Sequence, residues 1–206
     1  MSIAFDHLAI AATDLAAGVA EIEAALGVPL APGGRHATMG THNRLLSLGP
    51  GEYLEVIAPD PDAPAPGRPR WFALDAFSGP PAPRAWILRC DDMTAALAAA
   101  PEGTGRPTDF ARDDLRWQMA VPDDGWLPFG GLFPALIQWQ AGRHPAGRLP
   151  DRGVRLTGLT LIHPDAEALR DALSALFTDP RLRVEAAEEP AMRLALDTPR
   201  GAVVLG

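Results

Sequence analysis

Apolar and polar positions follow a pattern that repeats three times along this 206-residue chain. Each time, an apolar, strand-like run leads through an aspartate into a short amphipathic helix. The three runs are Phe5-Asp6-His7-Leu8-Ala9-Ile10, Ala85-Trp86-Ile87-Leu88-Arg89-Cys90 and Leu156-Thr157-Gly158-Leu159-Thr160-Leu161-Ile162. A strand–helix unit that recurs within one chain indicates a fold built by duplication, so equivalent positions can be compared between the copies.

Helical periodicity is clearest after the first run. Steps of four, three and four residues place four apolar side chains on one helical face, namely Leu15, Val19, Ile22 and Leu26. Thr13 or Asp14 can accept hydrogen bonds from the free N–H groups at the helix start. Gly27 can adopt the left-handed conformation that commonly ends a helix.

The remaining predicted elements set the domain organisation. Strands are expected at residues 35–40, 44–48, 53–57, 115–120, 136–140, 181–186, 192–196 and 202–205, and further helices at 93–100 and 166–177. The first copy therefore has the order strand, helix, strand, strand, strand. We divide the chain into a first unit at residues 1–60, a proline-rich linker with a short helix at 61–83, a second unit at 84–145 and a third at 154–206.

Composition and charge exclude several classes of function. The net charge of −8 disfavours a nucleic-acid partner, since phosphate binding requires a basic face. No stretch approaches the ~18 apolar residues of a membrane-spanning helix, and the N-terminus lacks the pattern of a signal peptide. The single cysteine, Cys90, allows no internal disulfide. We therefore expect a cytoplasmic protein with no membrane or nucleic-acid partner.

Several segments together resemble a known family. They are Asp6-His7-Leu8-Ala9-Ile10 with Thr13-Asp14-Leu15, Gly33-Gly34-Arg35-His36, Gly40-Thr41-His42-Asn43, Tyr53-Leu54-Glu55-Val56-Ile57-Ala58-Pro59, and Ala135-Leu136-Ile137-Gln138-Trp139 followed by His144-Pro145. With the repeated unit, they resemble the glyoxalase-like domain family of the vicinal oxygen chelate superfamily. The resemblance implies an α+β fold of repeated βαβββ units whose curved mixed sheets form a cup. It also implies a homodimer as one possible assembly.

In that superfamily the cup holds a divalent metal whose ligands come from the first and fourth strands of each unit. The resemblance therefore implies that His7 and Glu55 are metal ligands and catalytic residues, with Ni, Fe, Mn or Zn as the metal. In the second unit, Ala85 stands opposite His7, and Gln138 stands opposite Glu55 as a weaker, neutral ligand. In the third unit the same comparison gives Gly158 and Val204. Either His36 or His42 helps to hold a weakly bound metal, or the pocket works without one.

Other residues are candidates for contact with a small-molecule substrate. They are His36, His42, Asn43, Gln138 and Trp139, although core packing is the simpler interpretation for Trp139. Trp126 and Phe129, in a loop with adjacent glycines, suggest a mobile lid, although anchoring on the protein surface is the commoner role of such residues. For Glu55, the alternative to catalysis is a structural salt bridge to an arginine such as Arg44. For His7, it is a hydrogen-bonded core position.

Three functions remain open at this point. The first is an enzyme of the lyase, isomerase or dioxygenase type that acts on a substrate with vicinal oxygens. The second is a metal-free protein that binds an antibiotic or another aromatic compound. The third is an interaction module whose cup is filled by its own side chains. The incomplete ligand set favours the second function more than the fold alone does, because one fold hosts many chemistries.

Overall fold

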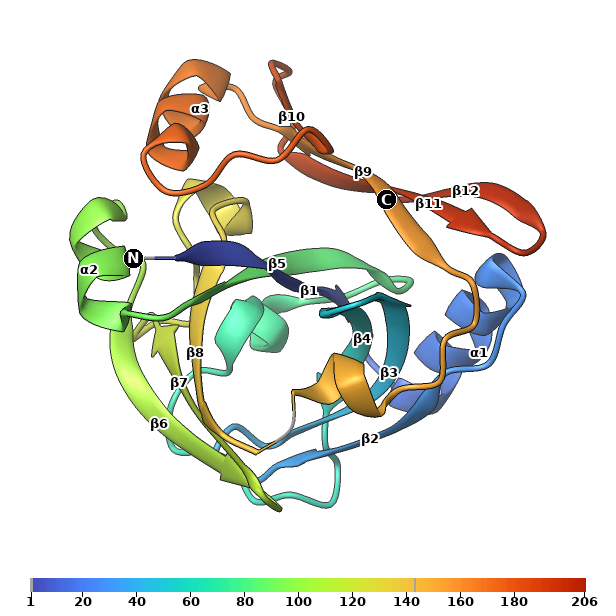
Figure 1. The fold of residues 1–206 in the computed structure, drawn as a ribbon. Helices are drawn as coiled ribbons and strands as arrows, with labels where there is room; N and C mark the ends of the chain where they lie inside the picture. The colour runs from blue at the N-terminus through green and yellow to red at the C-terminus, as the bar shows by residue number, and fades with distance from the viewer. Residues whose placement is uncertain (1, 143) are drawn as a thin grey trace.

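A curled eight-stranded sheet and a smaller four-stranded sheet make up most of the molecule in the computed structural model, which describes residues 2–142 and 144–206 (Figure 1). The large sheet contains β1 (Ile3–Ala11), β2 (Ala31–His36), β3 (Thr41–Gly49), β4 (Glu52–Pro59), β5 (Ala82–Cys90), β6 (Arg106–Arg112), β7 (Leu115–Val121) and β8 (Ala135–Ala141). The small sheet contains β9 (Arg155–Ile162), β10 (Leu182–Glu185), β11 (Ala191–Thr198) and β12 (Gly201–Leu205). The helices are α1 (Leu15–Leu26), α2 (Met93–Ala99) and α3 (Ala166–Ser174), with 3₁₀ turns η1 (Trp71–Ala76), η2 (Phe129–Gly131) and η3 (Pro145–Arg148).

The large sheet consists of two βαβββ units that meet at β1 and β5. Its strand order is β2-β3-β4-β1-β5-β8-β7-β6. β1 pairs parallel with β4, β5 pairs parallel with β8, and β1 and β5 pair antiparallel. Asp14 caps α1 by accepting from the Ala17 N–H, and Asp92 caps α2 by accepting from the Ala95 N–H. The expected α+β fold of repeated βαβββ units is thereby confirmed for this sheet.

The large sheet curves until its two edge strands, β2 and β6, come into contact. Helices α1 and α2 lie outside the curve, so its inner face encloses the cup that the sequence predicts (Figure 1). Within the described residues, no helix has the length and apolar character needed to cross a membrane. A cytoplasmic location stays a prediction.

The third segment keeps the order strand, helix, strand, strand, strand, but its strands pair differently. β9 lies between β10, its parallel neighbour, and β11, its antiparallel neighbour. In the first unit, by contrast, the parallel partner of β1 is β4, the last strand of the unit. Gly158 and Val204 therefore do not occupy the positions of His7 and Glu55. This corrects the position-by-position comparison of the third copy with the first.

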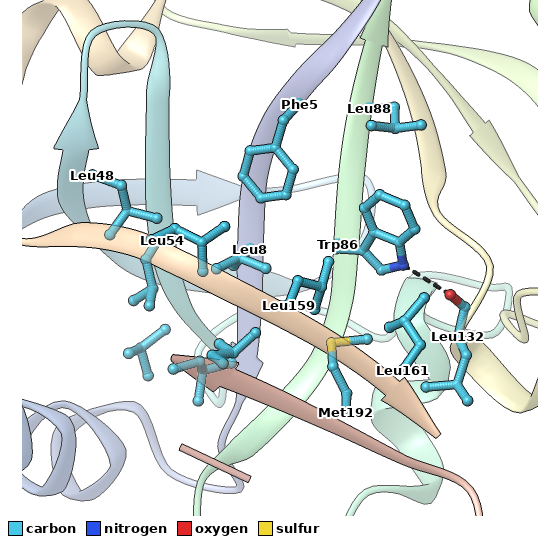
Figure 2. Packing of buried hydrophobic residues seen from close by; sticks show 14 of the residues in the cluster. Phe5, Leu8, Leu48, Leu54, Trp86, Leu88, Leu132, Leu159, Leu161 and Met192 are labelled. Atoms are coloured by element: carbon cyan, nitrogen blue, oxygen red, sulfur yellow. Dashed lines mark hydrogen bonds between the residues drawn. The ribbon is translucent and has the colours of Figure 1, made fainter. Parts of the chain in front are cut away.

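The small sheet covers the convex face of the large one with a continuous apolar core. Figure 2 shows Leu159, Leu161 and Met192 of the small sheet packed over Leu8, Leu54 and Trp86 of the large sheet. The indole N–H of Trp86 is satisfied inside this core because it donates to the carbonyl of Leu132 at 2.8 Å. Burying such large apolar side chains stabilises the fold by roughly 1.5–3 kcal/mol for each one. The concave face is thus left as the place for a cavity.

One predicted strand needs correction, and one strand was not predicted. The strand expected at residues 35–40 lies at Ala31–His36, and residues 37–40 form the turn that follows. Gly33 and Gly34 lie within this strand, not in a turn, because the chain there runs close against neighbouring side chains. The sequence did not indicate β6, because its residues are mostly polar or exposed and show no apolar alternation.

Cys90 is expected to be unreactive in the folded protein. Burial, with smaller contributions from the charges of Asp91 and Asp92, raises the pKa of its thiol to about 11, so little of the nucleophilic thiolate exists at pH 8. Mass spectrometry after iodoacetamide treatment at pH 8 should detect no alkylation of the native protein and complete alkylation in guanidinium chloride. Rapid alkylation of the native protein would contradict this burial.

Candidate active site

A small cavity lies on the concave face of the large sheet, bounded by residues from both units and from η1. Its lining comprises His7, His36, Asn43, Leu45, Tyr53, Glu55, Trp71, Phe72, Arg112, Trp117, Met119, Ile137 and Trp139. About 30 Å³ is open to the centre of a water molecule, which corresponds to room for about two waters. Aromatic side chains fill most of the cup, so the polar groups around the remaining space are held in fixed positions.

A bulge in β1 brings two consecutive polar side chains together. Neighbouring residues of a strand normally point to opposite faces, but the pairing of β1 with β5 shifts register between Phe5 and His7, so Asp6 bulges out of the ladder. As a result, the His7 Nδ1–H donates to Asp6 Oδ1 at 2.6 Å. Both side chains are buried.

Asp6 is a fully buried carboxylate that serves several donors. In addition to His7, the indole N–H of Trp139 and Nε2–H of His144 each donate to Asp6 Oδ2 at 3.0 Å. Burial opposes ionisation, but the hydrogen bonds from His144 and His7 outweigh it and hold the pKa of Asp6 well below its usual range. An ionised Asp6 fixes the His7 proton on Nδ1 and leaves the Nε2 lone pair facing Glu55.

Glu55 is held by an amide whose orientation is fixed in turn. The Asn43 Nδ2–H donates to Glu55 Oε2 at 2.6 Å. The Gly34 N–H donates to Asn43 Oδ1 at 2.8 Å, which identifies the oxygen side of the amide. The other carboxylate oxygen, Oε1, lies 3.8 Å from His7 Nε2, a distance too long for a hydrogen bond. Two basic atoms thus face each other across a gap, with the carboxylate anchored from behind.

The alternative salt bridge of Glu55 to Arg44 is not formed. Within residues 2–142 and 144–206, no arginine lies in ion-pair distance of Glu55. Arg44 lines a separate surface groove, as does His42. The structure therefore does not support the alternative in which Arg44 neutralises Glu55.

His36 lines the cavity, but both of its ring nitrogens are engaged. Arg112 Nη1 donates to His36 Nε2 at 3.0 Å, so the ring proton is on Nδ1 and points to Thr41 Oγ1 at 3.1 Å. Burial, followed by the charge of Arg112, lowers the pKa of His36 to about 3. His36 is therefore neutral, and neither nitrogen is free to complete a metal shell.

His42 and Gln138 do not reach this cavity, which corrects two predicted site residues. His42 alternates with Asn43 along β3 and faces the surface groove instead. Gln138 alternates with the cavity residues Ile137 and Trp139; it accepts from the Met93 N–H and donates to the Asp91 carbonyl, both at 3.0 Å. Its role in the structure is to hold the start of α2.

The strand pairing identifies the true counterpart of Glu55 in the second unit. Counted back from the helix caps, Ala85 and Ile87 match His7 and Ala9. Ala9 pairs with Glu55, and Ile87 pairs with Ala135 in the same way. A matching bulge at Arg84 in β5 supports this alignment, since Arg84 corresponds to Asp6. The second unit therefore offers two alanines where the first offers an imidazole and a carboxylate.

The residues present do not fit the resident divalent metal that the resemblance implies. In the part of the chain that the structure describes, no group of three His, Cys, Asp or Glu side chains is arranged to hold a metal ion. His7 and Glu55 supply two donors, while catalytic zinc sites use three protein ligands and non-haem iron oxygenases use a triad. No step of the chemistry proposed below involves a metal.

We expect at most weak metal retention. Protein dialysed without chelator should hold well below one equivalent of Ni, Fe, Mn or Zn by inductively coupled plasma mass spectrometry. A variant carrying both His7→Ala and Glu55→Gln gives the background of adventitious binding. One equivalent retained by the wild type and lost from that variant would show that this donor set binds metal after all.

Several cavity residues had no clear signal in the sequence. Trp71 and Phe72 come from η1, within the proline-rich linker, and Phe72 and Ala73 have left-handed backbone conformations (φ 58° and 49°). Arg84 Nε donates to the Phe72 carbonyl at 2.8 Å and so helps to hold this strained turn. Such strain is often found at functional sites. Asp6, Tyr53, Arg112 and Trp117 are the other lining or supporting residues that the sequence did not single out.

The predicted lid is not part of this cavity. Trp126 lies under the guanidinium of Arg84, with 4.8 Å from the ring centroid to Arg84 Cζ. Phe129 packs against Phe133 and His163. Neither residue lines the cavity, so their loop corrects the expectation of a mobile cover over His7 and Glu55.

Comparison with known proteins identifies the family. The family model described as a glyoxalase-like domain matches residues 5–177, and the chain belongs to this family. The glyoxalase-like resemblance that the sequence predicted is thereby confirmed. None of the curated proteins compared with this chain matches it.

One of the solved structures compared with this chain supports the fold. A hypothetical protein from Staphylococcus aureus aligns with a TM-score of 0.66 at 14% identity, over 93% of this chain and 88% of that one. Methylmalonyl-CoA epimerase from Mycobacterium tuberculosis aligns with a TM-score of 0.44 at 20% identity, over 69% of this chain and 91% of that one. These similarities concern the fold, and the function has to be argued from the site.

Proposed function

We propose that the cavity is the active site of a small-molecule enzyme that moves a proton on a carbon next to a carbonyl group, as lyases and isomerases do. The observation that carries this proposal is the facing pair of His7 Nε2 and Glu55 Oε1, 3.8 Å apart and buried. Each member is oriented by a further hydrogen bond, His7 through Asp6 and Glu55 through Asn43. This is the arrangement of a positioned general base with its orienting partner.

The proposed step uses Glu55 as the base and His7 as the proton carrier on the other side. Glu55 takes the proton from carbon, the electron pair of the C–H bond forms a carbon–carbon double bond, and the carbonyl π pair moves onto oxygen to give an enediolate. His7 Nε2, whose lone pair faces Glu55, then takes this proton from Glu55 and returns it to the enediolate. A substrate with vicinal oxygens suits this chemistry, because one carbon carries the carbonyl and its neighbour carries the acidic C–H.

A dioxygenase reaction is less well supported by the same residues. Non-haem iron oxygenases hold the metal with two histidines and a carboxylate, and only His7 and Glu55 offer free donors here, with Ala85 and Ala135 at the matching positions. The donors that the chain supplies therefore favour proton transfer over oxygenation as the proposed chemistry.

The alternative function is a metal-free binding protein, and the aromatic lining favours it. Tyr53, Trp71, Phe72, Trp117 and Trp139 surround the cavity, and such rings bind flat apolar ligands well. The small free volume speaks against a large aromatic antibiotic, since Trp71 and Phe72 would have to move. The same small volume agrees with the third function, because the side chains nearly fill the cup.

The test begins with a thermal-shift screen of small 2-hydroxy aldehydes and ketones, 2-oxo acids, catechols and aromatic antibiotics. Ligands that bind the native state raise the melting temperature by mass action. Compounds that bind are then incubated with the protein in D₂O, and proton NMR follows loss of the C–H signal beside the carbonyl. We expect exchange with the wild type and none with His7→Gln. Binding without exchange for every compound would overturn the enzyme proposal and support the binding protein.

A further inference from the structure

Where the cavity is lined by His36, it also contains an arginine that has no ion-pair partner among the described residues. Arg112, from β6 of the second unit, is half-buried and lines the cavity with its guanidinium. Its recorded hydrogen bond goes to His36 Nε2, a neutral acceptor. Within the described residues, no aspartate or glutamate lies in ion-pair distance of Arg112. A partly desolvated arginine commonly has an anionic partner, and here the chain supplies none.

The neighbouring glycine shows how closely this guanidinium is seated. A Cβ added to Gly34 would come within 2.7–2.9 Å of the Cδ, Nε and Nη1 atoms of Arg112. The same glycine donates its N–H to Asn43, which holds Glu55. Gly34 thus contacts the arginine and anchors, through Asn43, the proposed catalytic carboxylate, and both groups line one cavity.

A second group at this end lacks a partner. Trp71 lines the cavity and is 4% exposed, yet its indole N–H has no hydrogen-bond acceptor among the described residues. The indole N–H groups of buried Trp86 and half-buried Trp139 do have acceptors, the Leu132 carbonyl and the Asp6 carboxylate. Leaving a buried N–H unpaired is costly, so an acceptor is missing. Trp71 and Arg112 both adjoin His36, whose ring centroid is 5.0 Å from that of Trp71.

From this cluster we infer that Arg112 and the indole N–H of Trp71 bind a carboxylate of the substrate. The inference rests on the proposed function and names its substrate class as small carboxylic acids with oxygen on the adjacent carbon. A planar carboxylate matches the fork of a guanidinium and can accept from the indole at the same time. With its carboxylate at this end, the reacting carbon of such an acid lies towards the gap between His7 and Glu55.

Binding can be measured separately from catalysis. Isothermal titration with glycolate, lactate and pyruvate, at constant ionic strength, should give binding, while lactamide, which lacks the charge, should bind at least tenfold more weakly.

Arg112→Gln should weaken lactate binding by about 10–100-fold, as expected for a charged hydrogen bond, and Trp71→Phe by several-fold. Arg112→Lys keeps the charge but loses the planar fork, so its affinity for lactate should lie between those of the wild type and Arg112→Gln. Arg106→Gln, on the same strand but paired with Asp123 at the surface, is the matched control and should bind like the wild type.

The indole resonances give an independent readout that does not depend on the stability of the Arg112 variants. In ¹⁵N-labelled wild type, lactate should shift the Trp71 indole N–H, assigned by its absence in Trp71→Phe, and leave that of Trp86 unchanged. Equal binding of lactamide or inorganic phosphate, or no shift at Trp71, would overturn the inference. Carboxylate binding without proton exchange would overturn the proposed function and leave this inference standing. Proton exchange on neutral carbonyl compounds, without binding of carboxylates, would overturn this inference and leave the proposed function standing.

Discussion

Glu55→Gln will lower the turnover of the proton-transfer reaction by about 10²–10⁴-fold, the usual contribution of a positioned acid–base group. The substitution preserves size and leaves Asn43 a carbonyl oxygen to donate to, so the anchoring contact survives. It removes the carboxylate that faces His7 Nε2. Turnover is measured by the NMR exchange reaction with the best substrate from the screen, and stability by calorimetry of the same preparation.

Glu52→Gln is the matched control for this experiment. Glu52 begins the same strand, β4, but lies outside the cavity and pairs with Arg181 at 2.8 Å. Its substitution should lower stability slightly and leave turnover unchanged. If Glu55 had only a structural role, its own substitution would cost roughly 1–3 kcal/mol of unfolding free energy without loss of turnover. That outcome would remove Glu55 from the mechanism.

The sequence predicted the fold because local signals and the repeat agreed with each other. The cap at Asp14, the apolar face of α1 and the left-handed Gly27 (φ 72°) appear in the structure as expected. The pairing of His7 with Glu55 could also be predicted, because the resemblance placed both residues on strands whose positions the repeat defines. The helix and its two ends are features that a stretch of ten to twenty residues encodes by itself, whereas the placing of His7 with Glu55 came from the resemblance.

The sequence could not predict features that depend on strand register. An odd shift in register moves a side chain to the opposite face. Aligning Gln138 with Glu55 was wrong by three residues, because the strand pairing makes Ala135 the counterpart of Glu55. The bulge at Asp6 likewise has no marker in its composition. Arg112 was missed because its polar edge strand shows no apolar alternation, and Trp71 because a strained turn in the linker places it.

Asp6→Ala will lower the unfolding free energy at neutral pH by about 3–5 kcal/mol, the cost of breaking a buried, hydrogen-bonded charge cluster by removing one partner. The substitution leaves buried donors on His7, Trp139 and His144 without an acceptor. Chemical denaturation monitored by circular dichroism measures the loss. Asp123→Ala, which breaks an exposed ion pair with Arg106, should leave the stability close to that of the wild type and is the control.

The effect of Asp6 should also depend on pH in one direction. The pKa of Asp6 is depressed in the folded protein, while an unfolded aspartate titrates near about 3.9. A depressed folded pKa contributes stability that is fully present above the unfolded value and is lost as the pH falls through the folded one. The difference in unfolding free energy between wild type and Asp6→Ala should therefore shrink below about pH 4, as acid titrations at several denaturant concentrations will show. A difference that stays constant down to pH 2 would mean that the charge of Asp6 does not hold this cluster together, and that His7 is oriented by packing against Tyr53 alone.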